Sequence, residues 1–255
     1  FFPPGSYNVN KLTTFLNLDN ILIHGFGARL NLLNGTSAEL LKFDRCNHPR
    51  IKDLDFYGPN TGTYNPTDKH RCIYLTATKF AEISGCYFTG FDSQMIYFEL
   101  PGTGSSPIGA ASAGMRVTNN VFYNFTYDDS TSEQAAIYLA TDGEYSEFIG
   151  NQFYRLPCAI RAIGGANCSF TGNMMEECGA NTNWTSVKDR GIPIYLGNGG
   201  DNQGKMLFTG NQFNHNTIAS CPTIHIGIGL NGVPVQFINN QILVNGAATG
   251  AYPCV

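Results

Sequence analysis

Three carboxylates stand next to repeated aromatic segments and could transfer protons to a substrate. Glu99 ends the segment IYFE, and Asp142 and Glu144 follow the related segment IYLA at 137–140. Glycoside hydrolases use two carboxyl groups, about 5–10 Å apart, as acid and as base or nucleophile. If the two segments lie side by side, Glu99, Asp142 and Glu144 are the candidate catalytic residues. The alternative is that they are solvated turn residues, as most exposed acids are.

A second group of charged residues offers a different chemistry. Arg155, Glu176, Glu177 and His215 follow later apolar segments. A lyase that cleaves by β-elimination needs a base such as His or Arg, and a cation that neutralises the carboxylate of a uronic acid. These four residues could supply both, so they form a second candidate catalytic cluster. Ion pairing between neighbouring segments would explain them as well.

One three-residue segment recurs with an aromatic or basic residue at its centre. The copies read LKF, IYL, IYF, IYL, IRA, IYL and IHI, and their central residues are Lys42, Tyr74, Tyr97, Tyr138, Arg161, Tyr195 and His225. Side chains alternate between the two faces of a strand, so the central residues are expected to point outward. Aromatic rings beside charges suit the apolar faces and polar edges of sugars. From Tyr74 onward they are therefore the candidate substrate-binding residues. A trimer interface, or simple stabilisation of the sheet, stays open.

A second repeated segment alternates with the first along the chain. Its copies read IKDLDF, ISGCYF, VTNNVF, FIGNQF, FTGNMM, FTGNQF and FINNQI. The shortest interval between copies is 22 residues, from Phe148 to Phe170, and the longest is 38, from Phe170 to Phe208. Such intervals indicate the rungs of a parallel β-solenoid, in which stacked neighbours bury a shared core. A propeller blade needs four strands in about 40–45 residues, which the shortest interval cannot hold.

One slot of the second segment holds Asn in five successive copies, at Asn120, Asn151, Asn173, Asn211 and Asn240. Asn tolerates the left-handed backbone of a tight bend, and stacked Asn amides can hydrogen-bond to one another. Earlier copies place Leu54 and Cys86 in this slot, so a ladder is expected to begin at the fourth rung. We expect these Asn residues to be structural.

The composition excludes several classes of function. The chain has 255 residues of uniform composition, a net charge of −4 and only 13% charged residues. These values favour binding neither to nucleic acid nor to a membrane surface. No apolar run approaches about 18 residues, so no membrane insertion is expected, and no signal peptide is visible. The eight cysteines form no CxxC pair. We therefore expect no metal and no cofactor, and reduced, buried thiols rather than disulfides.

Two segments near the start resemble a known family. FFPPGSYNV resembles the PPGtY entry segment of the pectate-lyase-like superfamily, and NILIHGFGARL resembles its I-x-I-x-G-x-G signature. The resemblance covers nearly all of the chain and is strongest to bacteriophage tailspikes and capsule depolymerases. It implies an all-β fold, a single-stranded right-handed parallel β-helix (solenoid) of about seven to eight rungs. The catalytic NTD…DD…HG series of polygalacturonases and the aspartates of the pectate lyase calcium site are not found here.

The resemblance implies binding and cleavage of a bacterial surface polysaccharide, a capsule or an O-antigen, by a hydrolase or a lyase. It also implies a homotrimer, on a virion (phage tail) or extracellular. Residues 1–255 would form a single β-helix domain within a longer protein. Two alternatives stay open. One is a non-catalytic receptor-binding or structural β-helix of a virion, and the other is a bacterial pectinolytic or epimerase-like enzyme.

Overall fold

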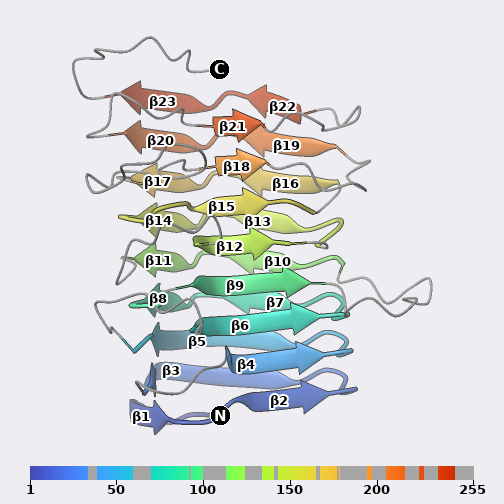
Figure 1. Cartoon of the computed structure of the whole chain (residues 1–255), viewed down its shortest axis with the longest axis vertical. Coiled ribbons are helices and arrows are strands. Elements are labelled where there is room, and N and C mark those ends of the chain that lie inside the picture. Colours follow the sequence, from blue (N-terminus) through green and yellow to red (C-terminus); the bar gives the residue numbers. More distant parts are fainter. Residues whose placement is uncertain are drawn as a thin grey trace.

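All regular structure in the described part of the chain is β-strand. The computed structural model describes residues 1–33, 39–59, 70–91, 93–99, 113–123, 134–140, 143–164, 167–176, 178, 194–196, 205–215, 224–226 and 235–244. The strands run across the long axis of the molecule and stack along it (Figure 1). Among these residues there is no helix long and apolar enough to span a membrane.

One face is an eight-stranded parallel sheet, which we call the first face and which lies in front in Figure 1. Its central triplets come from the first repeated segment. In spatial order it consists of β2 (Thr13–Leu16), β4 (Glu39–Asp44), β6 (Arg71–Thr76), β9 (Gln94–Glu99), β12 (Ala135–Leu139), β15 (Ile160–Ala162), β18 (Ile194–Leu196) and β21 (Ile224–Ile226).

The second repeated segment forms two further faces, because most copies bend in the middle and give two short strands. The second face contains β7 (Glu82–Ser84), β10 (Arg116–Thr118), β13 (Glu147–Ile149), β16 (Cys168–Thr171), β19 (Met206–Thr209) and β22 (Val235–Ile238). The third face contains β8 (Tyr87–Thr89), β11 (Val121–Tyr123), β14 (Gln152–Tyr154), β17 (Met174–Glu176), β20 (Gln212–His215) and β23 (Gln241–Val244).

Two long strands join the second and third faces at the N-terminal end. These are β3 (Leu22–Leu32), which also pairs with β1 (Gly5–Val9), and β5 (Arg50–Tyr57). The beginning of β5 pairs with β7 and its end pairs with β8, both in parallel. The chain thus visits the three faces in turn and pairs each strand with its counterpart one turn later. This is a parallel β-helix, as predicted.

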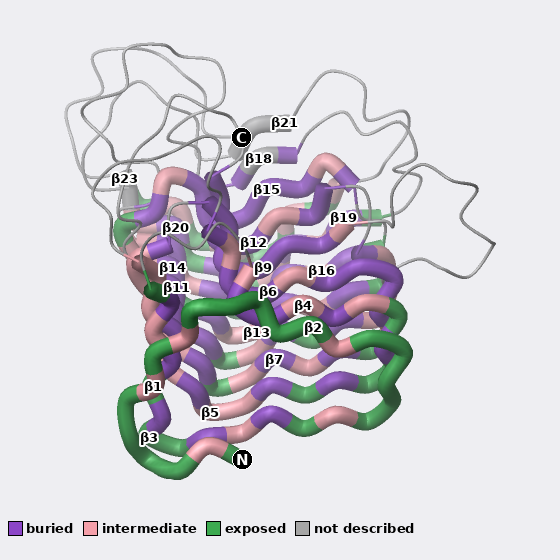
Figure 2. The backbone as a smooth tube through the Cα atoms, turned by 60° about the horizontal axis from the view of Figure 1, so that its bottom comes forward, coloured by how far each residue is buried: buried purple, intermediate pink, exposed green. Residues whose placement is uncertain are grey.

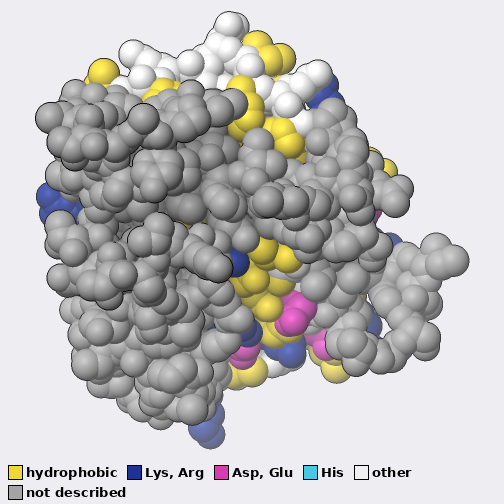
Figure 3. Space-filling view, turned by 45° about the horizontal axis from the view of Figure 1, so that its top comes forward, with side chains coloured by type: hydrophobic (Ala, Val, Ile, Leu, Met, Phe, Trp, Pro, Cys, Tyr) yellow, Lys and Arg dark blue, Asp and Glu magenta, His cyan; other side chains and the backbone are white. Residues whose placement is uncertain are grey.

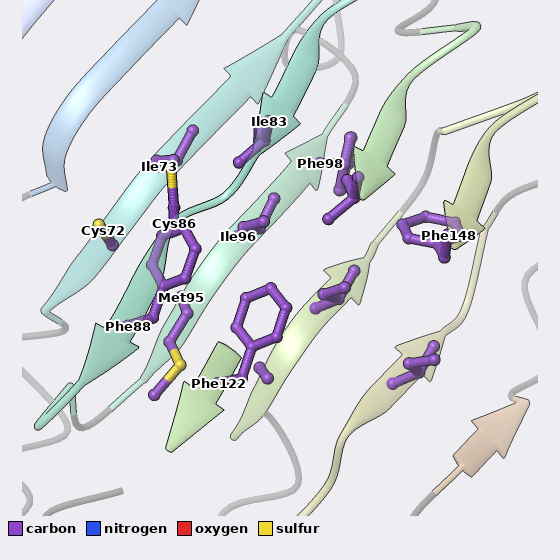
Figure 4. Close-up of a cluster of buried hydrophobic side chains, with 14 of the residues drawn as sticks. Cys72, Ile73, Ile83, Cys86, Phe88, Met95, Ile96, Phe98, Phe122 and Phe148 are labelled. Carbon is purple, nitrogen blue, oxygen red and sulfur yellow. The ribbon is translucent and has the colours of Figure 1, made fainter. Parts of the chain in front are cut away.

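Apolar side chains from all three faces fill the inside of the coil. Figure 2 shows buried positions recurring along successive turns between the two ends of the coil. Figure 4 shows Ile, Met, Cys and Phe side chains of neighbouring strands directed into a shared interior. Ile73, Ile137, Ile160 and Ile194 have no exposed surface, which confirms the inward direction predicted for them. The prediction for Ile224 lies outside the described side chains.

The aromatic core residues stack in register between turns. Phe148, Phe170 and Phe208 are fully buried, with ring centroids 4.8 and 4.5 Å apart and nearly parallel planes. These separations match the spacing of about 4.8 Å between hydrogen-bonded strands. Each ring therefore lies on the ring of the turn before it, so the register of the strands and the packing of the core fix each other.

The predicted Asn ladder is present. The Asn120 side-chain amide donates to Oδ1 of Asn151 at 3.1 Å, and Asn151 in turn donates to Asn173 at 3.0 Å. Further links join Asn173 to Asn211 and Asn211 to Asn240, each at 2.9 Å. The ladder begins where expected, with the backbone N–H of Cys86 donating to Asn120.

Of the two reasons predicted for Asn at this slot, hydrogen bonding between amides is confirmed, whereas the left-handed backbone is wrong. The left-handed backbone belongs to the preceding residue, which is Asn119, Gly150, Gly172, Gly210 or Asn239, with φ between 52° and 65°. The ladder Asn has an ordinary φ, and its amide is selected by hydrogen bonding. Asn151 Nδ2 also donates to the Val117 carbonyl at 2.8 Å, and Asn151 Oδ1 also accepts from the backbone N–H of Asn120 at 3.1 Å.

The described cysteines are thiols buried inside the coil. Cys46, Cys72, Cys86, Cys158, Cys168 and Cys178 are all buried and unbridged, as predicted for core residues. Burial raises the pKa of Cys86 to about 12. It also raises the pKa of Cys72 and Cys178 above the usual range of a thiol. Cys221 and Cys254 lie outside the described residues.

Candidate functional site

The predicted stripe on the first face is in register. Strand pairing places Tyr74 between Lys42 and Tyr97, and continues through Tyr138 to Arg161. The backbones of Tyr195 and His225 extend the same row on β18 and β21, and their side chains lie outside the described ones. Since strands pair about 4.8 Å apart, the row presents one side chain per turn along the axis of the β-helix.

Rings and cations are interleaved along this row. The Tyr97 ring lies 5.3 Å from that of Tyr74 and 5.4 Å from that of Tyr138, tilted to both. The Lys42 ammonium lies 4.8 Å from the Tyr74 ring centroid, and the Arg161 guanidinium lies 5.6 Å from that of Tyr138. In Figure 3 the described part of this face shows hydrophobic side chains with basic and acidic ones beside them.

The row is unevenly exposed. Tyr97 and Arg161 are only 7% and 6% exposed, whereas Lys42, Tyr74 and Tyr138 are half-buried. An external ligand can therefore contact the half-buried side chains directly. Tyr97 and Arg161 have little exposed surface of their own, and they contact the rings of Tyr74 and Tyr138.

Glu99 makes the closest contact on this face. It is the last residue of β9, and it accepts a hydrogen bond of 2.5 Å from the phenol of Tyr74 on the neighbouring strand. Burial, and then the hydrogen bond to Glu99, raise the pKa of Tyr74 well above that of an ordinary phenol. Tyr74 therefore keeps its proton, donates a hydrogen bond to Glu99 and holds the carboxylate in place.

Sequence reasoning missed a polar cluster on the other side of the row. Arg71 lies with its guanidinium carbon 4.0 Å from the Tyr97 ring centroid. It donates to Gln94 Oε1 at 2.7 Å and lies 3.4 Å from a carboxylate oxygen of Glu39. Buried Ser93 also donates to Gln94, at 2.8 Å. A signal was present in the sequence: Glu39, Arg71 and Gln94 each stand three residues before a stripe residue.

Of the other predicted acids, Glu144 does not lie on this row. Glu144 pairs with Ala113 in the corner between the first and second faces, so it belongs to the turn after β12. Asp142 lies outside the described residues. The carboxylate that shares a register row with Glu99 is Asp44, two strands away with Thr76 between them. Asp44 pairs with Arg45 at 2.9 Å.

The second candidate cluster lies on the third face. Glu176 pairs in register with Tyr154, and Arg155, which is exposed, places its guanidinium 5.0 Å from the Tyr154 ring centroid. Tyr154 stacks on Tyr123 at 5.4 Å with nearly parallel rings. Glu177 and the side chain of His215 lie outside the described ones. The described pair thus forms part of an aromatic row, with Arg155 packed on a ring.

No metal centre marks the site in the described residues. No three His, Cys, Asp or Glu side chains there are grouped as metal ligands. A cavity of about 150 Å³ lies at the N-terminal end, lined by Phe1, Phe15, Leu30 and other apolar residues. It contains none of the candidate residues.

No protein-family model matches the chain, and no curated protein sequence matches it. Among solved structures it is similar to PfbA, a surface adhesin of Streptococcus pneumoniae (12% identity, TM-score 0.45, 94% of this chain and 81% of the adhesin). It is also similar to tailspike protein gp49 of Pseudomonas phage LKA1, with 9% identity and a TM-score of 0.48. This match covers 96% of this chain and 44% of the tailspike. A third similar structure is a mannuronic acid specific polysaccharide family 6 lyase from human gut microbiota, with 13% identity and a TM-score of 0.37. This match covers 94% of this chain and 75% of the lyase. By its own strand pairing, the chain is a parallel β-helix.

Proposed function

We propose that the chain binds a polysaccharide across the first face and cleaves it with Glu99 as the proton-transferring residue. The observation that carries this proposal is the Tyr74–Glu99 hydrogen bond within a row of tyrosines that are in register. The half-buried rings of Tyr74 and Tyr138 offer apolar surface to sugar C–H groups. The Lys42 ammonium and the Glu99 carboxylate offer polar partners to hydroxyls at the edges of the same rings.

The raised pKa of Tyr74 bears on the mechanism. A base that starts β-elimination works best when its pKa lies near the working pH, whereas burial moves the pKa of Tyr74 upward. This phenol is therefore better suited to hold Glu99 than to abstract a proton. A Glu99 carboxylate held in this way can activate a water as a general base, which favours hydrolysis at this site over elimination.

The resemblance to phage tailspikes extends this proposal to the biological setting. The polysaccharide is then a capsule or O-antigen of a bacterial surface, and the working protein is a homotrimer on a virion or outside the cell. The runner-up is a non-catalytic receptor-binding β-helix, which would use the same tyrosine row for contact alone.

The test separates binding from cleavage. Purified capsular and O-antigen polysaccharides are incubated with the protein, and reducing ends and the ultraviolet absorbance of unsaturated uronates are both recorded. Glu99→Gln is expected to keep binding and to lose cleavage by roughly 100-fold or more, as for a lost acid–base group. Tyr138→Ala is expected to weaken binding by about 1–3 kcal/mol, on the scale of aromatic stacking with other ring ligands.

Glu147→Gln is the matched control, because Glu147 is a partly exposed acid on the second face, paired with Arg116. It should cleave like the unchanged chain. Normal cleavage by Glu99→Gln would exclude the proposed role. Loss of cleavage in Glu176→Gln, with unsaturated products from the parent, would assign the chemistry to the third face. Binding without any product would support the receptor-binding alternative.

A further inference from the structure

The corner between the first and second faces carries a feature that neither the fold nor the first-face site explains. In six successive described turns the same slot of this corner holds a residue with a left-handed backbone, and the first three of these turns have a second such residue three positions earlier, at Asn17, Arg45 and Ala77. The residues at the shared slot are Asn20, His48, Phe80, Gly114, Tyr145 and Asn167, with φ between 52° and 68°. They follow the corner residues that pair from turn to turn, at the right-hand ends of β2, β4 and β6 in Figure 1.

Gly accepts this backbone at low cost, and Asn, Asp and His occur in it more often than other residues, whereas a bulky Phe or Tyr there is an outlier. Three turns nevertheless carry a ring at this slot: His48, Phe80 and Tyr145. We call these three residues the corner strip. Phe80 is 52% exposed and Tyr145 is 62% exposed. At Phe80 and Tyr145 the chain therefore has both a strained backbone and a solvent-exposed aromatic ring. Rings that served only packing would be directed inward.

The rings are arranged rather than scattered. The His48 and Phe80 rings stack with centroids 5.0 Å apart and planes 21° apart. On the next turn Gly114 leaves room for Phe80, because a Cβ at Gly114 would lie 2.6 Å from Phe80 Cδ1. Tyr145 occupies the following turn. A glycine in the middle of the strip thus makes space for an aromatic side chain.

Polar groups run alongside the corner strip, one residue earlier in each turn. This row contains Asn47, Lys79 and Glu144, joined from turn to turn by backbone pairing with Ala113 between the last two. It offers an amide, an ammonium and a carboxylate beside the rings. With Asp19, one turn before Asn47, the row carries both signs of charge, so the corner presents no field of one sign that would select a polyanion.

This combination fits a sugar better than a protein. Pyranose rings combine apolar C–H faces with hydroxyl edges, which match exposed rings flanked by mixed donors and acceptors. A stable protein interface buries about 800 Å² on each partner, and three side chains on one corner fall well short of that. We infer that the corner strip is a second carbohydrate-binding site, separate from the first face, which holds a further stretch of polysaccharide without cleaving it.

The backbone strain supplies a sharp test. Phe80→Asn and Tyr145→Asn remove the rings and suit the left-handed backbone, so the urea midpoint of unfolding should stay the same or rise. Affinity electrophoresis is run in gels that contain alginate, polygalacturonate, dextran, or bacterial capsular and O-antigen polysaccharides. In gels that retard the parent chain, the double variant should lose about fivefold or more in affinity, on the scale of one aromatic stacking contact.

Phe26→Ala is the control, because Phe26 is 77% exposed on β3 and outside the corner strip. It should bind like the parent. Unchanged retardation of the double variant, a lowered urea midpoint for Phe80→Asn, or a parent that no gel retards would each overturn the inference. The proposal for the first face is tested with different variants. Loss in Tyr138→Ala alone supports that face only, and loss in the corner variants alone supports the corner only.

Discussion

At the scale of single residues, hydrogen bonding decides the identity of the ladder Asn side chains. Asn151 is fully buried, and its amide must satisfy two N–H groups and an oxygen without water. It does so through Val117 and Asn173 on the donor side and through Asn120 on the acceptor side. Asn is well suited to this position because it combines both functions in one short side chain.

Asn151→Ala is therefore expected to destabilise the fold strongly. The change removes the oxygen that accepts hydrogen bonds from the side-chain amide and the backbone N–H of Asn120. It also removes the N–H groups that donate to the Val117 carbonyl oxygen and to Asn173 Oδ1, and all of these groups are buried. Each unsatisfied group costs about 1–3 kcal/mol, so we expect a total loss of roughly 3–5 kcal/mol in urea unfolding. Gln152→Ala, next to it and exposed, should change stability by less than about 0.5 kcal/mol. Similar small losses for both would contradict the ladder's role.

At the scale of elements, the sequence predicts the strands better than the corners. The alternation of apolar residues places Ile73 and Tyr74 on opposite sides of β6, as observed, because a strand has a fixed period of two. The bend that divides the second segment into two faces depends on one left-handed residue, Asn119 or its equivalents. The periodicity of hydrophobic residues does not predict which residue takes this left-handed conformation. The same holds for Glu144, whose place in a corner separates it from Glu99.

Register between turns is expected to depend on the aromatic stacks inside the coil. Phe170 lies between Phe148 and Phe208 with no exposed surface. Phe170→Ala should cost about 3–5 kcal/mol in urea unfolding, because it removes a large buried ring and leaves a cavity. Phe170→Leu should cost clearly less, since Leu refills much of the volume. Equal losses for Leu and Ala would show that shape, rather than buried volume, dominates this position.

At the scale of the whole molecule, the β-helix turns a one-dimensional repeat into rows of side chains at fixed spacing. The row on the first face, the corner strip and the tyrosines of the third face all arise because each slot recurs about every 4.8 Å. The rows differ in what they can do. Buried Asn and Phe rows hold the turns together, whereas the half-buried row at Tyr74 and the exposed row at Phe80 remain available for ligands.

The same interior gives the molecule a characteristic alkaline limit. Burial raises the pKa of the Cys86 thiol to about 12 and raises those of Cys72 and Cys178 as well. In the unfolded chain a thiol titrates near pH 8.5. Above that pH the folded state therefore binds more protons than the unfolded state, and the free energy of unfolding must fall as the pH rises. Each buried thiol contributes a slope of up to about 1.4 kcal/mol per pH unit between its two pKa values.

We expect guanidinium unfolding under reducing conditions, followed by circular dichroism, to show stability falling from about pH 8.5 toward about pH 10.5. Cys86→Ala should have a shallower slope than the parent chain, because one thiol no longer titrates on unfolding. Tyr74→Phe should flatten the decline only above about pH 10, where an unfolded phenol ionises, since the pKa of Tyr74 is raised in the fold. A parent chain with constant stability up to about pH 10.5, or a Cys86→Ala slope equal to the parent's, would mean that these thiols are open to solvent and that the interior described above is not closed around them.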